Sequence, residues 1–577
     1  MFPVYTQYRP EQSVQVFVAI APNSSDGNSV AVTVFHHHTR VRAVRLSLPE
    51  LWRQQGIVDL GVFSDGGYHV VCDLQGEDGT ETARTAFDVR AHWRNAPRYS
   101  FLCNFTPSDT QEDMQEDMQE NGQEDTQENT QENAQENMQT FFRRFHLNVT
   151  QFYDWMERHD ALVPRTSEFV DPMGRKLYTE VITSRMQALR EIQSASIAYA
   201  AVYASLTDYA QAHPEQGIYD NQGVQYSLID RFFLMDISES SLWREHILAE
   251  FGRVVQFGFD GLHLDQYGFP KSAQRRNGTM MWMDDAYLSF IGACREALGD
   301  QTGLIFNAVS GYPIHTVSAS AQDAVYVEVW PPMVRYRHLC ALIERVRREA
   351  AGTKQVILAA YLKSFRAERE TRPDAIARSV LLVTAVIFAS GGYHLLLGES
   401  GEMLAEAYYP DYNPMIPELY DPLRALYDIV TADADLLSAP DVVDVSWSFV
   451  GGINEEILIR GAPISVEPDT GTVWVRVTLT HRGLVLHFIN LLWVDHEEWN
   501  SVHQEPFRST PPLDVSIEWN HPVDGVYVQR AEATGWIRAD MDWKSHVRGK
   551  ALHLTVPSFD VWAMLFVPYN TDSESAK

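Results

Sequence analysis

Hydrophobic and polar residues alternate over short segments in the first part of the chain. Within residues 1–98, turns containing Gly, Asn, Asp or Pro separate these segments from one another. The segments are VQVFVAI (14–20), VAVTVFH (30–36), AVRLSL (43–48) and YHVVCDL (68–74). Short apolar or alternating segments that recur at such intervals predict the strands of a small β-sandwich.

Residues 141–435 show a different pattern, in which short apolar runs alternate with longer segments of helical periodicity. Two of the helical segments are residues 284–299 and 337–352. The apolar runs are NVTQFYDW (148–155), ASIAYAAVY (195–203), RFFLMD (231–236), GFDGLHLD (258–265), GLIFNAV (303–309), AVYVEV (324–329), QVILAAY (355–361) and GYHLLLG (392–398). A series of eight strand–helix repeats of this length predicts a (β/α)8 TIM barrel.

Alternation returns in residues 440–570, for example in TVWVRVTLTH (472–481) and GLVLHFINLLW (483–493). We expect a second, antiparallel β-sandwich there. A chain of 577 residues exceeds the size of one hydrophobic core, so a multidomain protein is expected in any case. The predicted order is a β-sandwich, a central barrel and a C-terminal β-sandwich.

Residues 99–140 contain a low-complexity tract and are predicted to be a linker. From Gln111 to Met138 the sequence repeats the tetrad Q-E-(D/N)-x seven times. Such a tract has no apolar stripe and cannot bury a core, so we expect a solvated spacer. An acidic interaction segment is the alternative.

Charge narrows the choice of partners. The formal net charge is −31, and the acidic tract accounts for only part of it. Nucleic acids and anionic membranes are bound by clustered positive charge, so we expect neither as a partner. No run of 18 apolar residues is present, which argues against a membrane span. A neutral substrate suits this surface better, and we expect a monomer.

The cysteines and the N-terminus bear on metal binding and on cellular location. The four cysteines form no CxxC pair and have no histidine at zinc-finger spacing, so no metal site is expected. The first residues lack a basic segment followed by an apolar core, so no signal peptide is visible. By default this indicates a cytoplasmic protein.

In a TIM barrel the functional residues lie at the carboxyl ends of the strands. Two carboxylates stand out at these positions. Asp265 closes the apolar run GLHLD, where a carboxylate needs specific partners; capping the next helix is the structural alternative. Glu328 lies in VYVEVWPP, where apolar neighbours should raise its pKa, as a general acid requires; a buried ion pair is the alternative.

Histidines on the predicted strands are weaker candidates. His263 and His394 have no carboxylate neighbours at metal-ligand spacing, and a lone strand histidine is more often an interior hydrogen-bonding group. No phosphate loop, nucleophile-elbow serine or dinucleotide fingerprint is present. We therefore expect no cofactor.

Several segments together resemble glycoside hydrolase family 66, the family of dextranases and cycloisomaltooligosaccharide glucanotransferases. The resemblance covers nearly the whole chain. Its segments are QFYDWMERHD (151–160), IAYAAVYAS (197–205), LMDISESSLWREHILAEF (234–251), GFDGLHLDQYG (258–268), LIFNAVSGY (304–312), VYVEVWP (325–331) and HLLLGE (394–399).

The resemblance implies roles for the two carboxylates. Asp265 would be the nucleophile and Glu328 the acid/base of a reaction that retains the anomeric configuration. It also implies that the N-terminal β-sandwich is immunoglobulin-like and that the protein is extracellular. Candidate sugar contacts are Tyr153, Asp154, Trp155, Tyr203, Asp236, His263, Asn307, Trp330 and His394.

The chain also departs from the family pattern. Gln266 and Tyr267 follow the predicted nucleophile where the family has Asp-Thr, which affects subsite shape. Only about 30 residues separate the last two predicted strands, too few for the carbohydrate-binding module that the resemblance implies for cyclising members. Endo-hydrolysis of α-1,6-linked, dextran-like glucan is therefore expected. The alternatives are a glucanotransferase of the same family and a non-catalytic glucan-binding protein.

Overall fold

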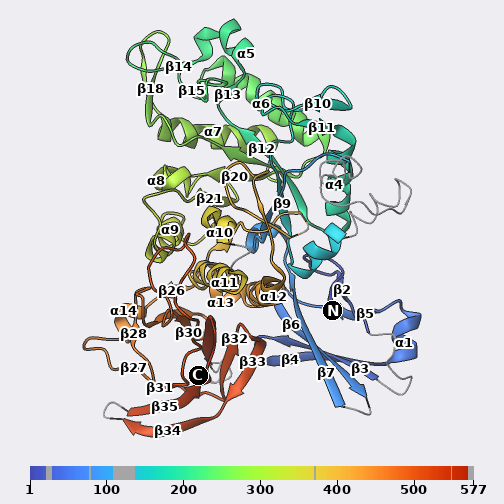
Figure 1. Ribbon diagram of the computed structural model, residues 1–577, viewed down its shortest axis with the longest axis vertical. Helices are drawn as coiled ribbons and strands as arrows, with labels where there is room; N and C mark the ends of the chain where they lie inside the picture. The colour runs from blue at the N-terminus through green and yellow to red at the C-terminus, as the bar shows by residue number, and fades with distance from the viewer. Residues whose placement is uncertain are drawn as a thin grey trace, which may run out of the picture.

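A computed structural model describes residues 1–20, 29–76, 79–107, 137–368, 372–399, 401–546 and 549–569. Its centre is an eight-stranded parallel sheet that curves into a nearly closed barrel (Figure 1). The strands are β8 (Tyr99–Leu102), β9 (Val149–Phe152), β12 (Ala195–Ala201), β17 (Gly261–Asp265), β20 (Gly303–Asn307), β21 (Ala324–Glu328), β22 (Gln355–Ala359) and β23 (Tyr393–His394). A parallel bridge between Phe101 and Gly398 joins the two ends of the sheet.

Helices follow most barrel strands, as the periodicity predicts. The longer ones are α4 (Thr179–Glu191), α6 (Leu242–Phe257), α7 (Met283–Leu298), α9 (Tyr336–Glu349), α11 (Pro373–Ala389) and α12 (Pro417–Ala432). Capping residues fix where these helices begin and end, as in α6. Ser241 caps α6 by accepting a hydrogen bond from the Trp243 amide, and Gly258 ends that helix with a φ of 124°. In the described part of the chain, no helix has the length and apolar character needed to cross a bilayer.

Two expectations about the barrel strands were wrong. RFFLMD (231–236) contains β16 (Phe232–Leu234), which pairs with β13 (Ala204–Ser205) and β15 (Ser227–Leu228) in a small separate sheet. The first barrel strand is instead β8, which lies inside the predicted linker of residues 99–140. Four buried residues give no period to recognise, so the short run YSFL was missed.

The predicted linker is also shorter than expected at its other end. Residues 137–144 are helical, and Met138 is completely buried. The rest of the repeated tract, Gln111 to Glu136, lies outside the described residues, and the spacer stays a prediction.

Two antiparallel sheets form the N-terminal region. The first contains β1 (Phe2–Pro3), β2 (Ser13–Phe17) and β5 (Ile57–Val62), and the second β4 (Thr39–Ser47), β3 (Ser29–His36), β6 (Gly66–Gly76) and β7 (Gly79–Val89). Alternate residues of β3 are buried, and they share one core with residues of the first sheet. The immunoglobulin-like topology stays a prediction.

The C-terminal region also has two sheets around one core. One contains β26 (Val443–Asp444), β28 (Ile464–Ser465), β29 (Val473–Thr480), β30 (Gly483–Asn490), β36 (Trp562–Pro568), β32 (Val526–Arg530) and β33 (Ala533–Ala539). The other contains β27 (Ile457–Arg460), β31 (Leu513–Glu518), β35 (Gly549–Val556) and β34 (Met541–His546). Helix α12 contacts β6 and β7 of the N-terminal region and β33 of the C-terminal region, so both terminal regions adjoin the same helix (Figure 1).

Candidate active site

Asp265 and Glu328 are the last residues of β17 and β21, which lie on either side of β20 in the barrel. Asn307 ends β20 and therefore lies between them. Its Nδ2 donates hydrogen bonds to Asp265 Oδ1 at 2.7 Å and to Glu328 Oε2 at 3.2 Å. The Glu328 amide donates to Asn307 Oδ1 at 3.3 Å, which orients the side-chain amide with its nitrogen toward the carboxylates.

A tyrosine hydroxyl completes the hydrogen bonding of each carboxylate. Tyr199 of β12 donates to Asp265 Oδ2 at 2.7 Å, and Tyr361, just beyond β22, donates to Glu328 Oε1. Each carboxyl group thus has one oxygen bonded to Asn307 and the other to a tyrosine. Since the donors come from neighbouring strands, the barrel itself fixes the orientation of both groups.

Both carboxyl groups are buried and electrostatically coupled. Burial and the adjacent charge of Glu328 raise the pKa of Asp265 to about 7, although hydrogen bonds from Tyr199 and Asn307 act in the opposite direction. Burial also raises the pKa of Glu328 above its usual value. Repulsion between two close carboxylates favours a state in which the pair holds one proton near neutral pH.

The carboxylates lie in a cavity of ≈ 370 Å³ lined largely by aromatic side chains. Tyr153 stacks on Tyr409 with ring centroids 4.1 Å apart. Trp330, which is 38% exposed, packs against Tyr361, the tyrosine that is hydrogen-bonded to Glu328. Flat, partly exposed rings next to buried carboxylates suit the apolar faces of a sugar. Two larger cavities, of ≈ 1210 and ≈ 860 Å³, lie among the C-terminal strands and beside α12, away from this pair.

Five of the predicted contact residues line this cavity: Tyr153, Asp154, His263, Asn307 and Trp330. Asp154 has a positive φ of 45°, and burial raises its pKa to about 7. His263 lies deeper, where Nδ1 is 3.1 Å from the Tyr99 hydroxyl. Burial lowers the pKa of His263 to about 3, so its ring is neutral and serves as an interior hydrogen-bonding group.

The other four predicted contact residues do not line the cavity. Trp155 is completely buried, and its indole donates to the Tyr199 carbonyl at 3.2 Å. Tyr203 donates to the Phe269 carbonyl, and Asp236 pairs with Arg275 in the loops above the barrel. His394 is buried beside Thr384. All four were predicted to lie at strand ends and to face the site, but their side chains point into the core or toward neighbouring segments.

Several tyrosines of the cavity were not among the predicted sugar contacts, including Tyr199, Tyr408 and Tyr409. Tyr199 lies in the middle of β12, where every residue but the first is buried and no alternation marks the inward face. Tyr408 and Tyr409 lie in a loop beyond β23, and no pattern marked that loop as part of the site. Among the described residues, the His and carboxylate groups close enough to hold an ion lie outside this cavity.

Known proteins share sequence with this chain over most of its length. The sequence profile of Glycosyl hydrolase family 66 matches residues 6–566. Two cycloisomaltooligosaccharide glucanotransferases of Niallia circulans are each 22% identical, over 84% and 98% of this chain and 62% and 72% of their own lengths. A dextranase of Streptococcus salivarius is 23% identical over 74% of this chain and 60% of its own length. The chain therefore spans less than two thirds of two of these relatives.

A solved structure shares the fold. The cycloisomaltooligosaccharide glucanotransferase of Paenibacillus sp., solved with cycloisomaltoheptaose, superimposes with a TM-score of 0.82 at 20% identity. The match covers 98% of this chain and 99% of that one. Together with the profile match over nearly all residues, this shows that the chain belongs to glycosyl hydrolase family 66.

Proposed function

We propose that this protein is a retaining glycosidase that cleaves α-1,6-linked glucan within the chain, with Asp265 as nucleophile and Glu328 as acid/base. The observation that carries the proposal is that the side-chain amide of Asn307 bridges the two carboxylates. Oxygens that share Asn307 Nδ2 at 2.7 and 3.2 Å lie no more than about 6 Å apart. Retaining pairs are separated by about 5–5.5 Å and inverting pairs by about 6.5–9.5 Å, so the bridge supports retention.

In the first step, Glu328 transfers its proton to the glycosidic oxygen as the bond from that oxygen to the anomeric carbon breaks. Asp265 forms a new bond from a carboxylate oxygen to the same carbon, giving a covalent glycosyl ester. Asn307 and Tyr199 hold the attacking group in place through their hydrogen bonds to Asp265. The leaving chain departs with the proton from Glu328.

In the second step, the ionised Glu328 accepts a proton from water, whose oxygen attacks the anomeric carbon and displaces Asp265. The Tyr361 hydroxyl hydrogen-bonds to Glu328 and stabilises its ionised form between the two steps. If a sugar hydroxyl replaces water, the same chemistry transfers the glucan instead of hydrolysing it.

The substrate class is inferred from the relatives and from the surface charge. Both types of relative have names that refer to isomaltooligosaccharide or dextran, and a net charge of −31 suits a neutral polymer. Hydrolysis is favoured by the short connection between β22 and β23, which holds only α10 (Lys363–Glu368) and α11 among the described elements. Transfer is the second candidate, because two relatives and the solved structure are glucanotransferases.

The test is to incubate the protein with dextran and separate the products by chromatography, with Asp265→Asn as the control for contaminating activity. Linear isomaltooligosaccharides are expected. Cyclic products would establish the glucanotransferase instead, and an unchanged polymer that still binds the protein would show a non-catalytic binder. Proton NMR of the first products should show the α-anomer; initial release of the β-anomer would contradict retention.

A further inference from the structure

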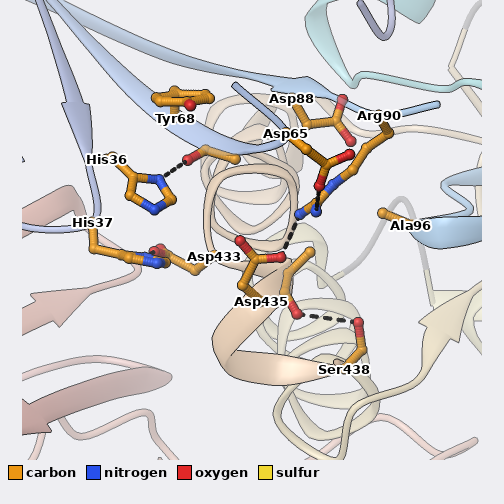
Figure 2. Close-up of polar contacts among 12 residues, drawn as sticks. His36, His37, Asp65, Tyr68, Asp88, Arg90, Ala96, Asp433, Asp435 and Ser438 are labelled. Atoms are coloured by element: carbon orange, nitrogen blue, oxygen red, sulfur yellow. Dashed lines mark hydrogen bonds and ion pairs between the residues drawn. The ribbon is translucent and has the colours of Figure 1, made fainter. Parts of the chain in front are cut away.

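The side chains of His36, His37 and Asp435 meet where the N-terminal sheets, the barrel and the C-terminal sheets adjoin (Figure 2). His36 ends β3, and His37 lies in the turn that follows it. Asp435 belongs to α13 (Ala434–Leu437), the short helix directly after α12. The active-site proposal makes no use of this cluster.

Hydrogen bonding assigns the tautomer of each histidine. His36 Nδ1 lies 3.0 Å from the Gly67 carbonyl, which can only accept, so Nδ1 carries the hydrogen (Figure 2). His37 Nδ1 lies 3.1 Å from Asp433 Oδ1 and donates in the same way. Each Nε2 atom therefore has a lone pair that can accept; that of His36 faces Arg482 Nη1 at 3.4 Å. His37 is only 5% exposed, and its Nε2 has no hydrogen-bond partner among the described residues.

A buried imidazole nitrogen without a partner is costly unless something binds it. In metal sites, ligating histidines donate their other ring N–H to a carboxylate or a backbone carbonyl. Asp433 and Gly67 supply these two acceptors here. The orientation of both rings is therefore already that of metal ligands.

We propose that His36 Nε2, His37 Nε2 and the Asp435 carboxylate bind a divalent transition-metal ion of the Zn²⁺ class. A ring nitrogen of each histidine and a carboxylate oxygen of Asp435 lie within 4.8 Å of one another. Neighbouring ligands of a tetrahedral zinc site lie roughly 3.3 Å apart, given bonds of about 2.0 Å. A small inward movement of the side chains closes the site, and water takes the fourth position.

Two arginines border the site and have different roles. Arg90 donates to Asp435 Oδ1 at 2.6 Å and is also held by Asp65 at 2.8 Å, so it stays in place and orients the carboxylate (Figure 2). Arg482 lies 3.4 Å from His36 Nε2 and 3.7 Å from Asp435 Oδ2. Its guanidinium therefore competes with a metal ion for the same ligands. The Arg482 side chain is 33% exposed and can move into solvent.

A bound ion would join β3 of the N-terminal sheets to α13 at the end of the barrel. Asp433, which orients His37, also accepts hydrogen bonds from Gln529 and Trp536 of the C-terminal sheet. Metal binding would thus stabilise the junction of all three parts, and a ligand that binds only the folded state raises Tm.

A second His and Asp group in the chain provides a matched control. Asp495, His496 and His503 are equally close together, but both ring nitrogens of His503 are already hydrogen-bonded. Nδ1 pairs with Asp495 at 2.9 Å and Nε2 with the Tyr336 hydroxyl at 2.8 Å. We expect no ion there.

The experiment uses the full chain without a histidine tag, treated with chelator and then titrated with Zn²⁺ by calorimetry. We expect one ion per chain and a rise in Tm on binding. His36→Gln should weaken binding about 10-fold or more, since it removes a ligand. Arg482→Gln should tighten it, because the competing cation is gone, and His496→Gln should change neither affinity nor Tm shift.

Circular dichroism of each variant separates lost binding from lost folding. Because His36→Gln and Arg482→Gln act in opposite directions, a general loss of stability cannot reproduce the expected pair of results. The proposal fails if the wild-type protein binds no stoichiometric Zn²⁺. It also fails if His496→Gln abolishes binding while His36→Gln leaves it unchanged, or if Arg482→Gln weakens it.

Discussion

At the residue scale, substitutions can distinguish the roles of Asp265 and Glu328. Asp265→Asn should abolish turnover of dextran with the fold intact, because an amide cannot form the glycosyl ester. Glu328→Gln should lose proton donation but still form the intermediate on substrates with good leaving groups. Such substrates should give a burst of leaving group, and azide should restore turnover by replacing activated water.

The contrast between the two variants is the decisive measurement. Wild-type turnover by Asp265→Asn on dextran would show that the nucleophile lies elsewhere. A burst in Asp265→Asn together with its absence in Glu328→Gln would show that the two roles are reversed.

The shared proton predicts a bell-shaped dependence of kcat/KM on pH. Below the first ionisation of the pair both carboxyl groups are protonated, so no nucleophile is available. Above the second, both are ionised and no acid remains; burial raises the pKa of Glu328, and burial and the charge of Glu328 raise that of Asp265, so this loss lies above the usual carboxylate range. With an activated substrate, Glu328→Gln should lose the alkaline limb. An unchanged alkaline limb would mean that another group supplies the proton.

Not every hydrogen-bond donor to these carboxylates could be predicted from the sequence. The sequence marked Asp265, Asn307 and Glu328 because each lies at or near the carboxyl end of a predicted strand. It could not mark Tyr199, because every residue but the first of β12 is buried and the pattern carries no inward or outward phase.

At the scale of elements, β17 and β20 approach each other closely because both begin with glycine. Gly261 pairs with Gly303, and a Cβ on Gly261 would lie 2.4 Å from the Gly303 carbonyl oxygen. Gly261→Ala should therefore push the strands apart, destabilise the protein by about 1–3 kcal/mol and lower kcat by displacing Asp265 from Asn307. Thermal unfolding and steady-state kinetics measure the two effects.

Gly252→Ala is the matched control. Gly252 lies inside α6, where a Cβ would meet nothing within 4 Å. Alanine there should stabilise the helix by roughly 0.5–1 kcal/mol and leave kcat unchanged. Equal effects of the two substitutions would show that the close approach of the strands is unimportant.

One barrel strand was predicted wrongly: RFFLMD (231–236) took the place of β8. Apolar content identifies a strand but not the sheet it joins, so RFFLMD was placed in the barrel and the four residues of β8 were left out. Because one strand replaced the other, Asp265 and Glu328 still fell on strands four and six. The strand positions of these two carboxylates were thus predicted correctly, although one of the barrel strands was not.

At the scale of the whole molecule, Asp433 links the three parts of the structure. Its carboxylate is completely buried and accepts hydrogen bonds from His37 and His69, from Gln529 at 2.8 Å and from Trp536 at 2.9 Å. Although burial opposes ionisation, the two histidines hold the pKa of Asp433 well below its usual range. Its stabilising contribution is therefore present at neutral pH and is lost only as the pH falls below the usual carboxylate range.

Asp433→Asn should lower the free energy of unfolding by about 3 kcal/mol or more, because buried donors lose a charged acceptor. Calorimetry at pH 7 measures the loss, which should shrink in acid because Asp433 then becomes protonated in the unfolded chain while the folded protein keeps it ionised. Asp441→Asn is the control: Asp441 pairs with His481, but both side chains are largely exposed, so about 0–1 kcal/mol is expected. Similar losses for both would contradict a central role for Asp433.

The sequence by itself determined the order of the three regions, most of the strands and helices, and the two strand-end carboxylates. These features follow from local periodicity and from the rule that barrel sites form at strand ends. Tertiary structure decided which side chains surround Asp265 and Glu328, and it alone brought His36 and His37, at the end of β3, close to Asp435 at the end of the barrel. No spacing along the chain encodes those contacts, because they depend on how separately folded elements pack against one another.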